Sequence, residues 1–236
     1  MVRRLVSELS PETVILYGSY AYGEPDESSD IDLFVVQAGP EPHKQQLARI
    51  DDVINEVPPG APVQAIVYSP EHVVERLRVG DQFIQEILDR GTVLHGKDWR
   101  EERYSIVVED PSAYSREWVE RADRDLRWMA IGFRERDPGV AGYYLQQALE
   151  KLLKAFLMAH GWRLQRTHNL KQLLDEAVVR EPSLAQFGDL CTAVTGWYMA
   201  DRYIDSKEEP PTEDQARAAR DAARPFIERL RTGVGS

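Results

Sequence analysis

Two aspartates near the N-terminus, Asp30 and Asp32, are separated by one isoleucine and lead into an apolar run. In a β-strand, side chains at positions i and i+2 face the same way, so both carboxylates share one side of the strand and Ile31 faces the other. Two carboxylates at such a short separation repel each other unless a cation lies between them or one of them takes up a proton. Magnesium is the natural cation, because one or two carboxylates, phosphate oxygens and water satisfy it.

The dipeptide Gly18-Ser19 complements the two carboxylates, because it directly follows another apolar run. Glycine lets the backbone approach a ligand closely, and the turn that follows, which we expect to begin a short helix, directs N–H groups at an anion. Alone, Gly-Ser is an ordinary turn and Asp-x-Asp a solvated strand start. Together they predict a site for a nucleoside triphosphate and Mg²⁺, with Gly18 and Ser19 at the phosphates and Asp30 and Asp32 at the metal.

Short β-branched and aromatic runs bounded by Gly, Pro, Ser or Asp predict strands over residues 14–17, 31–36 and 63–68. Apolar residues at helical spacing predict helices over residues 43–56 and 81–90, and Ser69-Pro70-Glu71 is a helix start. The first part of the chain is therefore expected to combine strands and helices, with a strand-helix-strand passage between the second and third strands.

The second half contains no convincing strand and is expected to be a helical bundle. We predict helices over residues 118–133, 141–160, 169–179, 184–203 and 212–231. In the second of these, Leu145, Ala148 and Leu152 face inward, whereas Glu150 and Lys154 are expected on the other side. The fold class is α+β, with an N-terminal domain over 1–97, a charged linker over 98–112 and a helical domain over 113–236.

Composition limits the classes of partner. The chain of 236 residues has 40 acidic and 29 basic residues and a formal net charge of −11, which argues against a surface that mainly neutralises nucleic-acid phosphates. Cys191 is the only cysteine, so we expect no disulfide and a core position, as in a reducing cytoplasm. The charged N-terminus is unlike a signal peptide and no apolar run reaches membrane-spanning length, so we expect a cytoplasmic protein without a membrane partner.

The first hundred residues resemble the minimal nucleotidyltransferases, a branch of the DNA polymerase beta-like superfamily. That family has Gly-Ser, ten intervening residues and Asp-x-Asp, which Gly18, Ser19, Asp30 and Asp32 reproduce. The resemblance implies a mixed β-sheet flanked by helices. It also implies magnesium-dependent transfer of a nucleoside monophosphate to a hydroxyl of a small molecule or protein, with release of pyrophosphate. We expect ATP to be the nucleoside triphosphate.

The family normally has a third carboxylate on the neighbouring strand, and the best matching position holds Gln64. Glutamine can coordinate through its carbonyl oxygen, but it cannot accept a proton as a base. A second interpretation therefore stays open: a nucleotide-binding regulatory protein, of the toxin-antitoxin type, with weakened catalysis. Alternatively, the helical domain supplies the carboxylate, as a resemblance to aminoglycoside nucleotidyltransferases would allow. Glu150 is one candidate, although a solvated helix charge with Lys154 at i+4 is the plainer interpretation.

The helical half is similar to the HEPN domain over about residues 113–231. The similarity is carried by the run 143–155, by Thr167-His168-Asn169-Leu170, and by Tyr198 with Arg202-Tyr203. It implies a substrate cover, a nucleotide-binding wall or a dimer surface, and we expect a homodimer. Two roles are open for Arg202 and Tyr203: contact with phosphate and base, or anchoring of a helix end.

Some HEPN domains are ribonucleases that use an arginine followed four to six residues later by a histidine. After Arg202 those positions hold Lys207, Glu208 and Glu209. Arg163 and His168 have the required spacing, but Gly161 indicates a loop there, so we do not expect ribonuclease activity.

Overall fold

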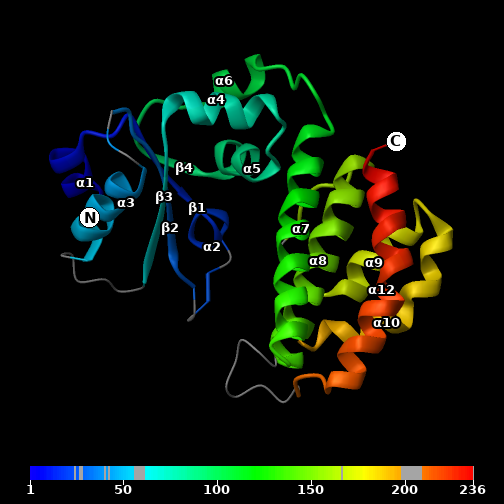
Figure 1. Ribbon diagram of the computed structural model, residues 1–236. Coiled ribbons are helices and arrows are strands. Elements are labelled where there is room, and N and C mark those ends of the chain that lie inside the picture. The colour runs from blue at the N-terminus through cyan, green and yellow to red at the C-terminus, as the bar shows by residue number, and fades with distance from the viewer. Residues whose placement is uncertain are drawn as a thin grey trace. The chain divides into compact units, whose positions relative to one another are not determined.

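The computed structural model describes residues 1–23, 25–26, 29–39, 41, 43–55, 62–165, 167–197 and 209–235. The chain divides into two compact units, Met1–Asp110 and Pro111–Ser236 (Figure 1). The described strands all belong to the first unit, and the described part of the second unit is helical. The α+β fold class is confirmed.

The N-terminal unit contains a four-stranded mixed sheet in the order β3-β2-β1-β4. Strands β2 and β3 are parallel, and β1 is antiparallel to both β2 and β4. The three predicted strands are confirmed, whereas α1 and β4 are additional elements. In chain order the unit comprises α1 (Val2–Leu9), β1 (Thr13–Tyr17), α2 (Ser19–Tyr22), β2 (Ile31–Val36), α3 (His43–Asn55), β3 (Val63–Tyr68), α4 (Pro70–Arg78), α5 (Gln82–Arg90), β4 (Thr92–Gly96) and α6 (Arg100–Ser105).

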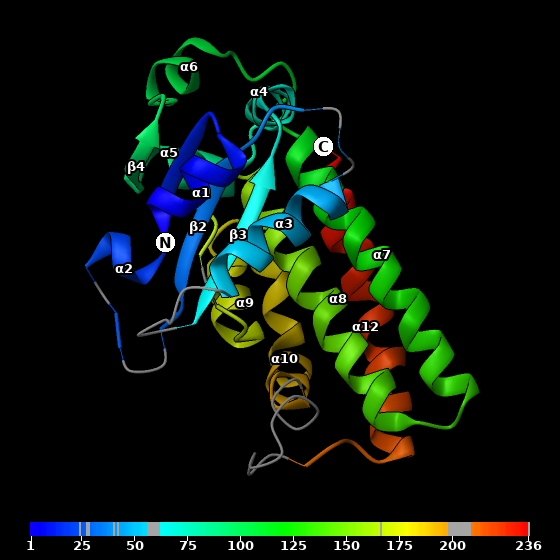
Figure 2. The ribbon, with the colours of Figure 1, turned by 90° about the vertical axis from the view of Figure 1, so that its left-hand side faces the viewer.

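Each face of the sheet has its own apolar core, because successive side chains of a strand alternate between faces. Leu33 and Val35 of β2 pack with residues of α1 and α3, and these two helices lie in front of the strands in Figure 2. Phe34 and Val36 of β2 pack on the opposite face with residues of α4 and α5. The even-numbered positions of β2, which include Asp32, therefore face the α4–α5 side.

The segment 98–112, predicted to be a linker, is partly packed on the N-terminal unit. Trp99 is buried and its Nε1 donates a hydrogen bond to Thr13 Oγ1 at 3.1 Å, after which α6 follows. The sequence analysis missed the burial of Trp99, because the segment is highly charged and a single buried indole produces no periodic apolar pattern.

The C-terminal unit is a helical bundle around α8. It comprises α7 (Ala113–Arg134), α8 (Pro138–Ala159), α9 (Leu170–Val178), a 3₁₀-helix (Pro182–Phe187), α10 (Gly188–Thr195) and α12 (Glu213–Val234). The helix predicted over 184–203 is wrong in its first turns, because the tighter 3₁₀ turn begins at Pro182 and the α-helix begins only at Gly188. Arg202 and Tyr203 lie outside the described residues.

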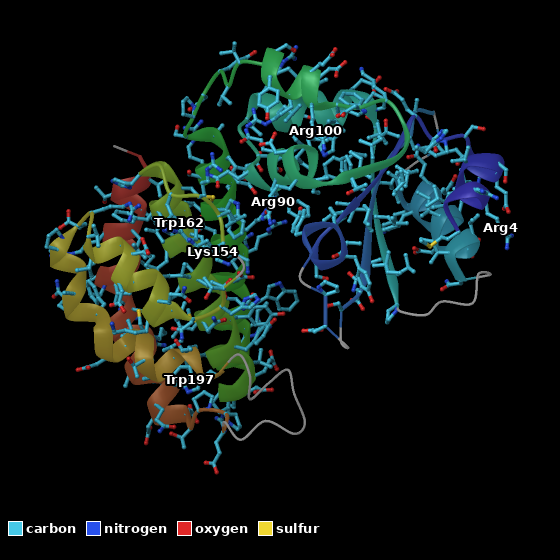
Figure 3. All side chains as sticks on the ribbon, turned by 180° about the vertical axis from the view of Figure 1, so that it is seen from behind. Arg4, Arg90, Arg100, Lys154, Trp162 and Trp197 are labelled. Atoms are coloured by element: carbon cyan, nitrogen blue, oxygen red, sulfur yellow. The ribbon has the colours of Figure 1, made fainter. Side chains whose placement is uncertain are left out.

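The tryptophans of this unit separate into core and surface positions. Trp162 and Trp197, labelled in Figure 3, are buried, whereas Trp128 is 51% exposed. Cys191 is also buried, as expected, and loss of hydration raises the pKa of its thiol to about 12. None of the described helices combines the length and apolar character needed to cross a bilayer.

Candidate functional site

One edge of the sheet brings together the residues that the sequence singled out. Strand β1 ends at Tyr17, which pairs with Asp32 of the antiparallel β2. Strand β3 runs parallel to β2, and Gln64 is the register partner of Asp32. Gly18 therefore follows one strand at the same edge where Asp32 and Gln64 begin the next two.

Two features of position 18 require a glycine: its backbone conformation and its close contact with another residue. Its φ of 74° and ψ of −160° lie in a region that only glycine populates readily. A Cβ atom at this position would lie 2.1 Å from Asp32 Oδ2. The Gly18 backbone and the Asp32 carboxylate are thus in direct contact, and the predicted short helix, α2, begins at Ser19.

Replacing Gly18 by alanine is expected to destabilise the fold by about 1–3 kcal/mol and to displace the Asp32 carboxylate. Gly23→Ala is the matched control, because Gly23 also has a positive φ, of 84°, but a Cβ there meets nothing within 4 Å. Thermal unfolding should show a loss for both variants, whereas nucleotide binding should fall only in Gly18→Ala. Equal nucleotide affinity in the two variants would contradict a role for the Gly18–Asp32 contact.

Asp30 is hydrogen-bonded to the neighbouring strand. Gln64 Nε2 donates to Asp30 Oδ2 at 2.6 Å. The amide therefore supplies a donor to this carboxylate without adding a charge of its own. Asp30 and Asp32 are both half-buried, and Gln64 is exposed.

The donor set fits a magnesium ion that is held jointly with a nucleotide. Among the residues that the structure describes, no group of three or more His, Cys, Asp and Glu side chains could hold a metal by itself. Magnesium does not require one, because it is commonly bound through one or two carboxylates plus phosphate oxygens and water. The Asp30 and Asp32 pair, with the Gly18 backbone against one of them, meets that description.

Family models match both units of the chain. Residues 1–94 match the nucleotidyltransferase domain, and residues 115–232, half of the chain, match the HEPN domain. The chain belongs to the HEPN family and carries a nucleotidyltransferase domain. Both resemblances inferred from the sequence are confirmed. No curated protein sequence matches the chain.

Three solved structures show similarity at low sequence identity. A nucleotidyltransferase-like protein from Exiguobacterium sibiricum is 11% identical over 99% of this chain and 76% of its own, with a TM-score of 0.48. Spectinomycin adenyltransferase from Enterococcus faecialis, solved with ATP and spectinomycin, is 11% identical over 100% of this chain and 96% of its own, with a TM-score of 0.49. A toxin-antitoxin solved with AMP-PNP is 20% identical over 51% of this chain and 89% of its own, with a TM-score of 0.30.

The HEPN domain contains a buried charged cluster on α8. Glu150 and Lys154 are each 5% exposed, which corrects the prediction that they face away from the core. Lys154 Nζ donates to Glu150 Oε1 at 2.8 Å, and Gln146 Nε2 donates to Glu150 Oε2 at 3.1 Å. The Nδ1 atom of His168 lies 3.1 Å from the same carboxylate. Burial is tolerated because each charge has a partner, which helical periodicity alone does not reveal.

Replacing Glu150 by alanine is expected to destabilise the protein by about 3 kcal/mol, because it leaves the Lys154 charge buried without its carboxylate. Denaturant unfolding would measure the loss. Glu135→Ala is the control, since that side chain is 63% exposed beside Arg134. The double variant Glu150→Leu with Lys154→Met should recover most of the stability. A Glu150→Ala variant as stable as Glu135→Ala would contradict this account.

The arginine-histidine pair with ribonuclease spacing does not lie on a helix. Arg163 and His168 both fall between the end of α8 at Ala159 and the start of α9 at Leu170. The side chain of His168 is bound to Glu150, and Asn169 caps α9 by accepting from the Gln172 backbone N–H. Arg163 and His168 therefore lie outside the regular helices, and His168 contacts the Glu150 carboxylate.

Proposed function

We propose that the protein is a magnesium-dependent nucleotidyltransferase. It transfers a nucleoside monophosphate from a nucleoside triphosphate, with ATP as the expected donor, to a hydroxyl and releases pyrophosphate. The acceptor is a small molecule or a protein. The observation that carries the proposal is the placement of Asp32 against Gly18 at one sheet edge, with Asp30 bonded to Gln64 of the adjacent strand, in a chain whose first 94 residues match the nucleotidyltransferase domain. A cytoplasmic location and a homodimer are part of the proposal; the location rests on the single cysteine and the charged N-terminus, and the homodimer rests on the family resemblance.

In this proposal each residue has a distinct role. Asp30 and Asp32 hold the magnesium that accompanies the triphosphate, while Gly18 and Ser19 let the backbone approach the phosphates. When bound, magnesium supplies charge neutralisation for the departing pyrophosphate and lowers the pKa of the attacking hydroxyl. Asp32 can serve only while it keeps its place against Gly18.

The geometry at Asp30 favours a second candidate function. The family's third carboxylate would stand where Gln64 stands, and the Gln64 amide donates to Asp30 instead of accepting a proton. A protein with this arrangement binds the nucleotide but turns it over slowly, as a nucleotide-dependent regulator would. Tight triphosphate binding without pyrophosphate release is the signature of this alternative.

The two functions are distinguished by incubating the full chain with magnesium and each α-labelled nucleoside triphosphate. Pyrophosphate release and label transfer are followed with and without a chelator, and the Asp30→Asn, Asp32→Asn double variant is the negative control. Release that needs both metal and aspartates supports the transferase, and label on the protein would identify the acceptor class. Binding without release supports the regulator, and release that persists in the double variant rules out the proposed site.

A further inference from the structure

The proposed nucleotide site lacks a cation on its own loop. Residues 18–32 contain five acidic residues and no lysine or arginine. A triphosphate adds further negative charge, and magnesium offsets only part of it. A positively charged side chain from another part of the fold would therefore strengthen binding of the triphosphate.

The connection between α5 and β4 reaches the same sheet edge. Thr92 of β4 pairs with Leu16 of the antiparallel β1, so the residues just before Thr92 pass the end of β1. A Cβ on Gly91 would lie 2.5 Å from Ile15 Cγ2 and 3.0 Å from Leu16 O, which shows that this backbone packs directly on β1. Arg100 Nη2 donates to Gly91 O at 2.9 Å and holds the connection in place.

The guanidinium of Arg90, the residue before Gly91, lies beside α2. Its guanidinium carbon lies 4.0 Å from the centre of the Tyr22 ring, and Figure 3 shows Arg90 beside this short helix. Tyr22 is the last residue of α2, and its backbone N–H donates to Gly18 O at 3.0 Å. A cation–π contact thus holds the guanidinium beside the one-turn helix that begins at Ser19.

The remaining surroundings of Arg90 leave it available to an anion. Its side chain is 53% exposed, and Nη1 pairs with Glu86 at 3.0 Å. Within the described part of the chain we find no other hydrogen bond from Arg90, so most of its N–H donors point to no protein acceptor. Arg76, Lys97 and Arg103 of the same unit are also paired with acidic residues, but their side chains are less exposed than that of Arg90.

We propose that Arg90 binds the phosphates of the nucleoside triphosphate and that Tyr22 positions it. This inference rests on the proposed function, because it names the cation of that same site. A guanidinium suits the task, since it stays charged and presents several donors to phosphate oxygens. The aromatic face restricts the side chain before the ligand arrives, which lowers the ordering cost of binding.

The test compares a triphosphate with the monophosphate of the same base. Binding of both to the full chain is measured with magnesium by calorimetry, using whichever of the four common nucleotides binds best. Arg90→Gln is expected to weaken triphosphate binding about 10- to 100-fold and monophosphate binding much less. Arg90→Lys should give an intermediate loss, because it keeps the charge without the fork of donors.

Arg78→Gln is the matched control, since Arg78 is 58% exposed and lies 4.0 Å from its acidic partner Glu109. Tyr22→Phe should bind normally, and Tyr22→Leu should lose part of the triphosphate preference. If the wild type binds in an aspartate-dependent way and Arg90→Gln is unchanged, or loses both nucleotides equally, the Arg90 assignment alone is overturned. If the wild type binds no nucleotide, the proposed function fails and this inference fails with it.

Discussion

Replacing Asp32 by asparagine is expected to lower the rate of nucleotide transfer at least about a thousandfold. The amide is similar in shape to the carboxylate but carries no charge, so it cannot balance a magnesium ion. Asp32 lies against the Gly18 backbone and pairs with Tyr17 across the sheet. Because these contacts fix the position of its carboxylate, we expect no neighbouring acidic residue to take over its role. The measurement is the rate of pyrophosphate release at saturating nucleotide and magnesium.

The control for this variant is Asp52→Asn, which makes the same chemical change on an exposed residue of α3. Helix α3 packs on the opposite face of the sheet, so the control should keep the wild-type rate. Unfolding midpoints of both variants should match the wild type, which separates a chemical loss from a folding loss. Transfer by Asp32→Asn at the wild-type rate would remove this carboxylate from the site.

The sequence predicted that Gly18, Asp32 and Gln64 lie at one edge of the sheet, because local sequence patterns determine this placement. The strands β1, β2 and β3 are compact β-branched runs with clear boundaries, and the two-residue period of a strand predicts Asp30 and Asp32 on one face. In the structure β2 begins at Ile31, so Asp30 directly precedes the strand. Gln64 could be assigned to the adjacent strand for the same reason, and the register then set it beside Asp32. These inferences needed only neighbours in the sequence and the rules of strand pairing.

Features that depend on long-range packing were missed. Strand β4 alternates between exposed and half-buried positions and includes a histidine, so it lacks the apolar run that identified the other strands. Glu150 and Lys154 were predicted on the polar side of α8, because burial of an ion pair depends on partners such as His168 on another segment. The contact of Arg90 with Tyr22 likewise arises only when β4 pairs with β1.

Replacing Gln64 by glutamate is expected to raise the transfer rate about a hundredfold or more, within the 10²–10⁴ range of general-base catalysis. Gln64 is exposed at the start of β3, so a carboxylate of the same length fits without repacking. It would replace the amide that now donates to Asp30 at 2.6 Å. Single-turnover transfer from a labelled triphosphate, measured at saturating magnesium, reports the chemical step directly.

The companion variant Gln64→Leu separates the two effects of this change, because it removes the hydrogen bond to Asp30 without adding a base. It should transfer no faster than the wild type. Three neighbouring carboxylates repel one another, so Gln64→Glu should also be less stable than the wild type without magnesium and should regain stability when magnesium is added. A faster Gln64→Glu would mean that the nucleotide and metal site is intact and that the missing base limits turnover. An unchanged rate, with normal nucleotide binding, would mean that Gln64 does not stand at the base position and that the acidic group, if the reaction uses one, comes from elsewhere in the chain.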